Sequence, residues 1–178
     1  MTTITTYTAA EAERLICSKK AEGEYHVTGW LYLIGCDLSG VTLPSSVTGW
    51  LDLSGCDLSG VTLPASVTGW LDLSGCDLSG VTLPASVGGG LDLRGCRNPD
   101  PSQWWTERGE ATRRRCIAVC PDDGYALVQT DTDLFSAGCR KNLTREQALA
   151  HWSRSDARAK LFTAAIEASI IAALGEEG

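Results

Sequence analysis

Hydrophobic and polar positions recur with a period of twenty along residues 27–98. Residues 47–66 read VTGWLDLSGCDLSGVTLPAS, and residues 67–86 repeat these letters without a change. The copy before them differs only at Tyr32, Ile34 and Ser45. Each position in an irregular core has different neighbours and therefore requires a different side chain. An unchanged repeat thus indicates units stacked by translation.

Within each unit the apolar positions indicate strands and turns. Leu51 and Leu53 alternate with polar neighbours, as in a half-buried strand, and no stretch keeps a 3.6-residue period. The chain is expected to bend at Gly55, Gly60 and Pro64. One such unit cannot close a core, but coils stacked about 4.8 Å apart share a continuous apolar interior. The repeats therefore predict a mainly β protein with a short parallel β-solenoid over residues 27–98.

Two coil types fit the repeat. The string LDLSGCDL resembles the leucine-rich-repeat segment L-x-L-x-x-N/C-x-L, with Cys56 at the asparagine or cysteine position. Cut into fives as LDLSG, CDLSG, VTLPA and SVTGW, the same residues resemble a pentapeptide-repeat β-helix, in which four fives form one coil. Ser66 and Thr68 are polar where the pentapeptide pattern requires apolar side chains. This mismatch favours the leucine-rich type.

The segment before the repeats, residues 1–26, predicts a helical cap. Thr8 and Glu11 have the spacing of a capping box, and an apolar helix face follows at Ala12, Leu15 and Ile16. A solenoid needs such caps because its terminal coils expose unpaired backbone groups and an apolar cross-section.

Residues 99–178 lose the period and predict a small α+β domain, which forms the second cap. Apolar stretches between Gly and Asp residues indicate short strands. Thr144 and Gln147 form a second capping box. A last helix is expected to have an apolar face that either packs on this domain or pairs two chains as a homodimer. Its residues are Ala157, Leu161, Ala164, Ala165, Ala168, Ile171 and Ala172.

Stacking turns each outward residue of the repeat into a column. Three tryptophans are predicted to stack as a ladder: Trp30, Trp50 and Trp70. One acidic column consists of Asp37, Asp57 and Asp77, and a second of Asp52, Asp72 and Asp92. Aromatic anchors beside carboxylates are typical of protein-binding surfaces. Aromatic ladders and turn aspartates also serve structure alone, and that interpretation stays open for both.

The acidic columns suggest two chemical uses, DNA mimicry and calcium binding. Parallel rows of carboxylates would present a duplex-like field to a basic nucleic-acid groove, which is DNA mimicry. Calcium between aspartates is less favoured, because the repeat lacks the Gly-Gly-x-Gly-x-Asp spacing of calcium-binding β-rolls.

Near-identical coils cannot read a partner residue by residue, so specific recognition is expected in the non-repeating tail. The candidates there are two adjacent tryptophans and three adjacent arginines: Trp104, Trp105, Arg113, Arg114 and Arg115. Such arginines would dock a phosphate or an acidic partner, although a solvated edge is the plainer interpretation.

Charge and targeting signals limit the function further. The chain has 15 Lys and Arg against 22 Asp and Glu, a net charge of −7, which argues against direct nucleic-acid binding and favours basic partners. The start shows no signal-peptide pattern, and no apolar run is long enough to span a bilayer. We therefore expect a cytoplasmic protein without membrane contact.

Catalytic motifs are missing from the sequence, which has two histidines, no phosphate-binding glycine loop and no HExxH. We expect no enzyme and no cofactor. Four of the eight cysteines fall twenty residues apart and are expected to be free thiols in a reducing compartment. A zinc site is a less favoured alternative, and its ligands would be Cys116, Cys120, Cys139 and His151. A strand would instead place Cys116 and Cys120 on one buried face.

Several features occur together as in a known family. VGGGLDLRGC is found at residues 87–96, AGCR at residues 137–140, a Thr-led helix start at Thr144, and HW at residues 151–152. This combination resembles short leucine-rich-like proteins of bacteriophages and prophages. The resemblance implies a phage or mobile-element origin but no agreed activity.

A non-enzymatic protein-binding module is the function that follows from these observations. With the resemblance, we expect it to inhibit a bacterial defence or DNA-handling complex, of the anti-CRISPR or anti-restriction kind, in the host cytoplasm. The alternatives are a phage structural or assembly protein and a small zinc-binding interaction module.

Overall fold

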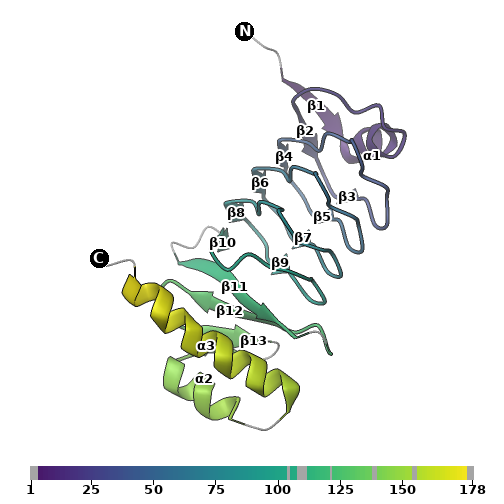
Figure 1. The fold of residues 1–178 in the computed structure, drawn as a ribbon. Helices are drawn as coiled ribbons and strands as arrows, with labels where there is room; N and C mark the ends of the chain where they lie inside the picture. Colours follow the sequence, from purple (N-terminus) through teal and green to yellow (C-terminus); the bar gives the residue numbers. More distant parts are fainter. Residues whose placement is uncertain are drawn as a thin grey trace.

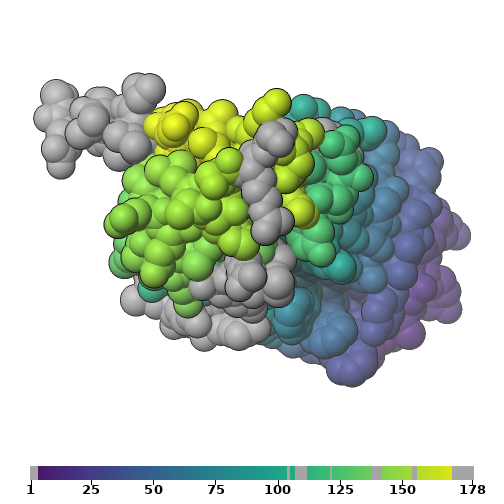
Figure 2. Space-filling view, turned by 90° about the horizontal axis from the view of Figure 1, so that it is seen from below, coloured from purple at the N-terminus to yellow at the C-terminus, as the bar shows by residue number. Residues whose placement is uncertain are grey.

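A computed structural model of the chain shows a β-solenoid with a C-terminal sheet and two helices at one end (Figure 1). In the space-filling view the C-terminal part lies at the near end and the coils run away behind it (Figure 2). The structure describes residues 4–103, 105–107, 112–120, 122–137, 140–153 and 156–175.

Each repeat contributes one strand to each of two parallel sheets. The first sheet contains β2 (Tyr25–Thr28), β4 (Ser46–Val47), β6 (Ser66–Val67) and β8 (Ser86–Val87). The second contains β3 (Leu31–Tyr32), β5 (Leu51–Asp52), β7 (Leu71–Asp72) and β9 (Leu91–Asp92). Paired residues lie twenty apart, as in Ser46 with Ser66 and Leu51 with Leu71. The predicted parallel solenoid is confirmed.

Tight turns join consecutive sides of a coil. The Cys56 N–H donates to the Leu53 carbonyl oxygen over 3.0 Å, and the same turn recurs one side later at residues 58–61. Gly55, the third residue of the first turn, has φ +68°, a left-handed conformation that favours glycine. The pairs Ser54-Gly55 and Ser59-Gly60 therefore mark two corners of the coil.

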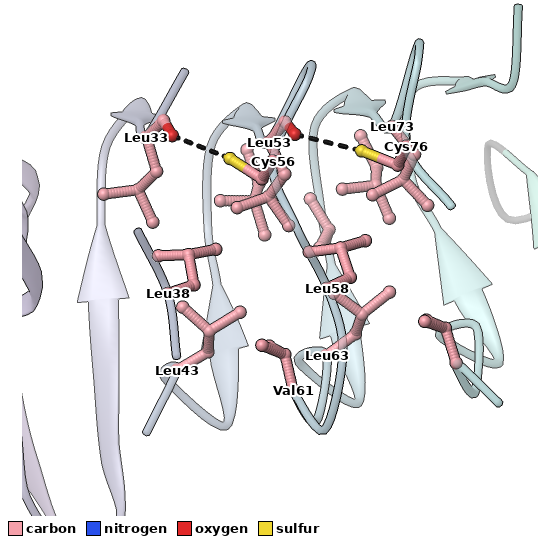
Figure 3. Packing of buried hydrophobic residues seen from close by; sticks show 14 of the residues in the cluster. Leu33, Leu38, Leu43, Leu53, Cys56, Leu58, Val61, Leu63, Leu73 and Cys76 are labelled. Atoms are coloured by element: carbon pink, nitrogen blue, oxygen red, sulfur yellow. Dashed lines mark hydrogen bonds between the residues drawn. The ribbon is translucent and has the colours of Figure 1, made fainter. Parts of the chain in front are cut away.

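The coil interior consists of apolar columns (Figure 3). On three sides of a coil two buried residues flank one outward residue, and successive pairs lie five apart: Leu51 and Leu53, Cys56 and Leu58, Val61 and Leu63. This spacing is that of the pentapeptide interpretation. On the fourth side Val67 is buried between polar Ser66 and Thr68. The polar pair thus belongs to a side with a single inward residue rather than to a different coil type.

The structural period extends beyond the sequence repeat at both ends. Thr6 of β1 (Thr5–Thr8) pairs with His26, and Thr106 of β10 (Trp105–Glu107) pairs with Ser86, again twenty apart. Their side chains do not follow the repeat, so the pattern of letters did not show this. The backbone ladder is therefore longer than the repeated sequence.

Helix α1 (Ala9–Cys17) closes the N-terminal end of the solenoid. The predicted capping box is present, with Thr8 as N-cap and Glu11 as its partner. Ala12 and Ile16 are fully buried against the solenoid core. The helix therefore covers the apolar cross-section that the first coil would expose.

The C-terminal part continues the first sheet with antiparallel strands. They are β11 (Arg113–Val119), β12 (Ala126–Thr130), β13 (Phe135–Ala137) and β14 (Arg140–Leu143). Helices α2 (Arg145–His151) and α3 (Ala157–Gly175) lie together over this sheet (Figure 1). The capping box at Thr144 and Gln147 is confirmed. Of the helices in the described ranges, none combines the length and apolarity needed to cross a membrane.

Helix α3 buries a face other than the one predicted. Ala159, Phe162, Ile166 and Ser169 are buried, whereas the expected Ala157, Ala164 and Ala168 are exposed, Leu161 and Ala165 are half-buried, and the side chains of Ile171 and Ala172 lie outside the described ones. Alanines occur on every side of this helix, so the apolar pattern did not distinguish its faces. Phe162 and Ile166 offer the largest apolar area and decide which face is buried. Pairing of two chains through α3 stays a prediction.

Candidate functional site

The outward side of the β3-β5-β7-β9 sheet carries the tryptophan column. Strand alternation turns Leu51 and Leu53 into the core and Trp50 and Asp52 outward. Trp30, Trp50 and Trp70 are 58%, 45% and 45% exposed. Large apolar side chains this exposed are unusual on a surface whose other outward residues are mostly Asp, Ser and Thr.

The three indoles form a ladder with two kinds of contact. Trp30 and Trp50 are stacked, with ring centroids 5.3 Å apart and planes at 21°. Trp50 and Trp70 are tilted, at 6.3 Å and 53°. The predicted stack is confirmed for the first pair and wrong for the second. Gly90 stands where the next tryptophan would be, and the Trp70 ring lies against it: a Cβ there would be 3.0 Å from Trp70 Cζ3.

Each indole also lies over the glycine that precedes the next tryptophan. A Cβ at Gly69 would approach Trp50 Cδ1 to 2.6 Å and the Gly49 carbonyl oxygen to 2.5 Å. Real Cβ atoms do not approach other atoms so closely, so the position requires glycine. The glycine and tryptophan of the TGW triplet therefore belong together, because the glycine of one coil makes room for the tryptophan of the preceding coil.

The first coil adds two further exposed apolar side chains to this side. Tyr32 is 41% and Ile34 61% exposed, where the next two coils have Asp and Ser. Sequence reasoning missed them, although they are two of the three differences between the first copy and the others. We call the surface formed by these two residues and the three tryptophans the ladder face.

Carboxylates follow the ladder face along one edge. They belong to Asp52, Asp72 and Asp92, each two residues beyond the tryptophan position and half-buried. Each accepts a hydrogen bond from the backbone N–H two residues on, at 2.9, 2.8 and 3.0 Å. Arg94 also pairs with Asp92 at 2.6 Å. Burial disfavours the charged form of Asp92, but the hydrogen bonds from Arg94 outweigh it and lower its pKa.

The second acidic column lies on the next side of the coil, beyond the turn, and serves the backbone there. Asp37, Asp57 and Asp77 each accept the N–H of the serine two residues on, at 2.9, 2.9 and 3.0 Å. Cations pair with both ends of the column: Lys19 with Asp37 at 2.7 Å, and Arg97 with Asp77 at 3.7 Å.

Hydrogen bonds to these carboxylates also shift their ionisation. The Asn98 side chain, followed by Ser79, lowers the pKa of Asp77 to about 2. Ser59 lowers the pKa of Asp57, and Lys19 holds the pKa of Asp37 well below its usual range. All three are therefore charged at neutral pH, but their oxygens are already engaged in turns and their field is partly neutralised at both ends.

A groove of about 260 Å³ opens where the ladder ends. Trp70, Asp92 and Arg94 line it from the solenoid, and Tyr125 and Ala137 line it from the C-terminal part. Tyr125 is 39% exposed, with the Arg158 guanidinium 5.3 Å from its ring centroid. The ladder face thus continues into a depression with aromatic and charged walls.

The recognition residues expected in the tail do not form a surface of this kind. Trp105 is 1% exposed and packs in the solenoid core, so its predicted role in binding is wrong. Trp104 lies outside the described residues. Because β10 closes the last coil, the Trp105 side chain completes the core and does not belong to a binding site.

The three arginines face two sides of strand β11. Arg113 is 3.4 Å from Asp131, and Arg115 donates to Gln129 Oε1 at 3.0 and 2.8 Å. Arg114 projects to the other side, as alternation along a strand requires. They therefore do not form a single basic patch.

The alternative zinc ligands are separated by a bulge. The ladder between β11 and β12 shifts register between Cys116 and Ala118. As a result, Cys116 packs in the solenoid core and Cys120 in the C-terminal core, and the predicted common face is wrong. Cys139 lies outside the described residues. Within the part of the chain that the structure describes, no three His, Cys, Asp or Glu side chains gather as metal ligands.

His151 and Trp152 hold α2 against the rest of the C-terminal part. Their rings make an edge contact at 5.3 Å, and Trp152 makes another with Phe162 of α3 at 5.4 Å. These contacts give both residues a packing role.

No family model matches this chain, and neither does any curated protein or solved structure. The assignment of the candidate site therefore depends on its geometry.

Proposed function

We propose that this protein is a non-enzymatic binding protein that holds a basic protein partner on the ladder face. The observation that carries the proposal is the unbroken row of exposed aromatic side chains, Trp30, Trp50 and Trp70, on an otherwise polar solenoid. Tryptophan and tyrosine are the side chains that most often anchor protein interfaces.

The chemistry of the face favours arginine side chains on the partner. A guanidinium can stack its face on an indole and at the same time donate hydrogen bonds, in its own plane, to a carboxylate. Trp50 with Asp52, and Trp70 with Asp72, provide this pair on one side of the coil. The net charge of −7 attracts a basic surface from a distance.

The class of partner follows from this chemistry and from the resemblance of repeats and tail to phage proteins. Arginine-rich surfaces are frequent on proteins that grip nucleic acid. We therefore propose a bacterial nucleic-acid-handling or defence complex as the target, and inhibition as the outcome. Mimicry of DNA by the Asp37–Asp57–Asp77 column is the less favoured form, because cations pair with both ends of this column.

The ladder face is tested with defined peptides before any lysate. We expect an arginine-rich peptide to bind more tightly than a lysine-rich peptide of equal length and charge in titration calorimetry, because lysine stacks less well. Trp50→Ala with Trp70→Ala is expected to weaken binding of the arginine peptide about tenfold or more. Unchanged affinity in this variant would overturn the proposal.

The two acidic columns supply a matched pair of variants. Asp52→Asn with Asp72→Asn is expected to weaken binding about threefold to tenfold, whereas Asp57→Asn with Asp77→Asn leaves it within about twofold. Asparagine keeps the oxygen that accepts the backbone N–H, so the turns survive in both. The reverse order would support the mimicry form instead.

Identification of the natural partner uses the same variants. A bacterial protein captured by the wild-type chain counts as the partner only if Trp50→Ala with Trp70→Ala loses it and Asp57→Asn with Asp77→Asn retains it. The captured complex is then assayed for loss of its own activity on addition of this protein.

A further inference from the structure

Four cysteines occupy one position of the repeat, but one of them has a different partner. Cys56, Cys76 and Cys96 each donate to the carbonyl oxygen of a leucine in the coil before, at 2.9, 3.2 and 2.9 Å. Figure 3 shows the first two of these bonds. This acceptor always lies 23 residues upstream. All three thiols are buried, and these contacts explain why the repeat keeps cysteine there.

Cys36 cannot follow this rule because α1 stands where the preceding coil would be. The position 23 residues upstream of Cys36 is Glu13, inside the helix. The Cys36 sulfur instead meets the sulfur of Cys17, the last residue of α1, at 3.1 Å. Cys17 is exposed and Cys36 half-buried, so solvent reaches this pair of thiols and not the rest of the column.

We propose that Cys17 and Cys36 are a redox site, at which a reversible disulfide bond fastens the N-terminal helix to the first coil. The two sulfurs lie at hydrogen-bond distance and need to approach by only about 1 Å to reach bonding distance. The bond would close a loop between a cap that covers the core and the coil that carries Trp30, Tyr32 and Ile34. No third metal-binding side chain accompanies the pair among the described residues, which favours oxidation over metal binding.

The electrons are accepted by a small disulfide such as oxidised glutathione. The Cys17 thiolate attacks one glutathione sulfur, forms a mixed disulfide and releases one glutathione thiolate. Cys36 then loses its proton to water, attacks the Cys17 sulfur and releases the second glutathione. Two protein thiols are thus oxidised while one glutathione disulfide is reduced to two thiols.

The order of attack follows from exposure and ionisation. Burial, with the hydrogen bond between the two thiols, raises the pKa of Cys36 to about 11, so this thiol stays protonated until the mixed disulfide places a sulfur beside it. Cys17, exposed at the helix end, therefore reacts first and Cys36 resolves.

To test this, the purified, reduced full-length chain is treated with oxidised glutathione. It is then digested with proteases that cut after Lys or Arg and before Asp. These cuts separate Cys36 from the cysteines of later coils, since Asp37 follows it directly. We expect a cross-link between residues 15–19 and residues 21–36, broken by reduction. Cross-links to another cysteine, or a mixed disulfide at Cys17 that never resolves, would overturn the proposal.

Matched variants distinguish the Cys17–Cys36 pair from the buried cysteines of the later coils. Cys17→Ser and Cys36→Ser are each expected to abolish the cross-link, whereas Cys56→Ser, the same repeat position one coil later, retains it. Oxidation should raise Tm by about 5 to 10 °C in wild type and leave it unchanged in Cys17→Ser. Cys17 is exposed, so its serine variant is expected to fold. An equal Tm shift in Cys17→Ser would also overturn the proposal.

Discussion

At the scale of single residues, the repeat is explained by close contacts between neighbouring coils. Gly49 and Gly69, the glycines before Trp50 and Trp70, lie under the indole of the preceding coil, and the glycines at the corners have positive φ. The aspartates at the turns hold the backbone N–H two residues on. The repeated glycines, aspartates and inward residues therefore have structural reasons, whereas burial does not explain the exposed tryptophans.

Gly69→Ala tests the contact between glycine and ladder. The added Cβ would lie 2.5 Å from the Gly49 carbonyl oxygen, so the coils must separate locally. We expect a loss of about 3 kcal/mol in the free energy of unfolding. Gly60→Ala is the control: a Cβ there meets nothing within 4 Å, and only its φ of +70° is strained, so about 1 kcal/mol is expected. Denaturant titration of both variants decides, and equal losses would contradict the steric explanation.

Asp77 predicts how stability depends on acid pH. Its pKa in the folded chain is about 2, below the value near 4 of an unfolded aspartate. The unfolded chain therefore takes up the proton first, so the contribution of Asp77 is complete above about pH 4 and is lost as the pH falls towards 2. Asp77→Asn keeps the oxygen acceptor but cannot titrate. Between pH 5 and pH 2.5 we expect Tm to fall less in Asp77→Asn than in wild type. An equal fall in both proteins would contradict the role of Asp77.

At the scale of elements, the sequence predicts local features such as helix starts better than it predicts contacts between distant segments. Both capping boxes are present as predicted, because a cap involves residues only three apart. The sequence did not single out the face of α3 that packs on the sheet, because an alanine-rich helix has no dominant apolar side and the sheet beneath it decides.

Phe162 and Leu161 distinguish the observed face of α3 from the predicted one. Phe162 is fully buried and contacts Trp152, whereas Leu161, on the predicted face, is half-buried. We expect Phe162→Ala to cost about 3 to 4 kcal/mol and Leu161→Ala about 1 kcal/mol. Thermal unfolding followed by circular dichroism measures both. A larger loss for Leu161→Ala would mean that this side of the helix is covered, as in a dimer.

At the scale of the whole molecule, the solenoid is a stack in which each coil contacts its two neighbours. Residues 47–66 and 67–86 are identical, and each coil bonds to the next through the same register. Stability then adds up from coil to coil, while the two ends need caps of their own. The caps are α1 at one end and the C-terminal sheet with its helices at the other.

Changing the number of coils tests this description directly. Insertion of one further copy of residues 67–86 after Ser86 keeps every pairing twenty residues apart. We expect a folded chain with the oligomeric state of wild type, with unchanged or higher Tm, and with a ladder longer by one tryptophan. An insertion of residues 67–85, one residue shorter, is the control, since it shifts every inward residue onto an outward or corner position and should unfold or aggregate. Similar behaviour of both insertions in circular dichroism and gel filtration would contradict the stacked register.

The stack, its register and the two local helix starts were determined by the sequence alone. A repeat of twenty letters can satisfy all its copies only if each copy has the same neighbours, and parallel pairing provides that. The tryptophan and aspartate columns follow from the same argument. Their exposure follows from strand alternation, since Leu51 and Leu53 take the inward positions.

Only the tertiary structure decided the features that depend on segments meeting across the fold. The bulge in β11 sends Cys116 and Cys120 into different cores, and β10 carries Trp105 into the solenoid. Helix α1 replaces a coil and so brings Cys17 to Cys36. In each case the partner is distant in sequence or breaks the repeat, so neither periodicity nor local propensity contains the information. Contacts between coils and caps supply it.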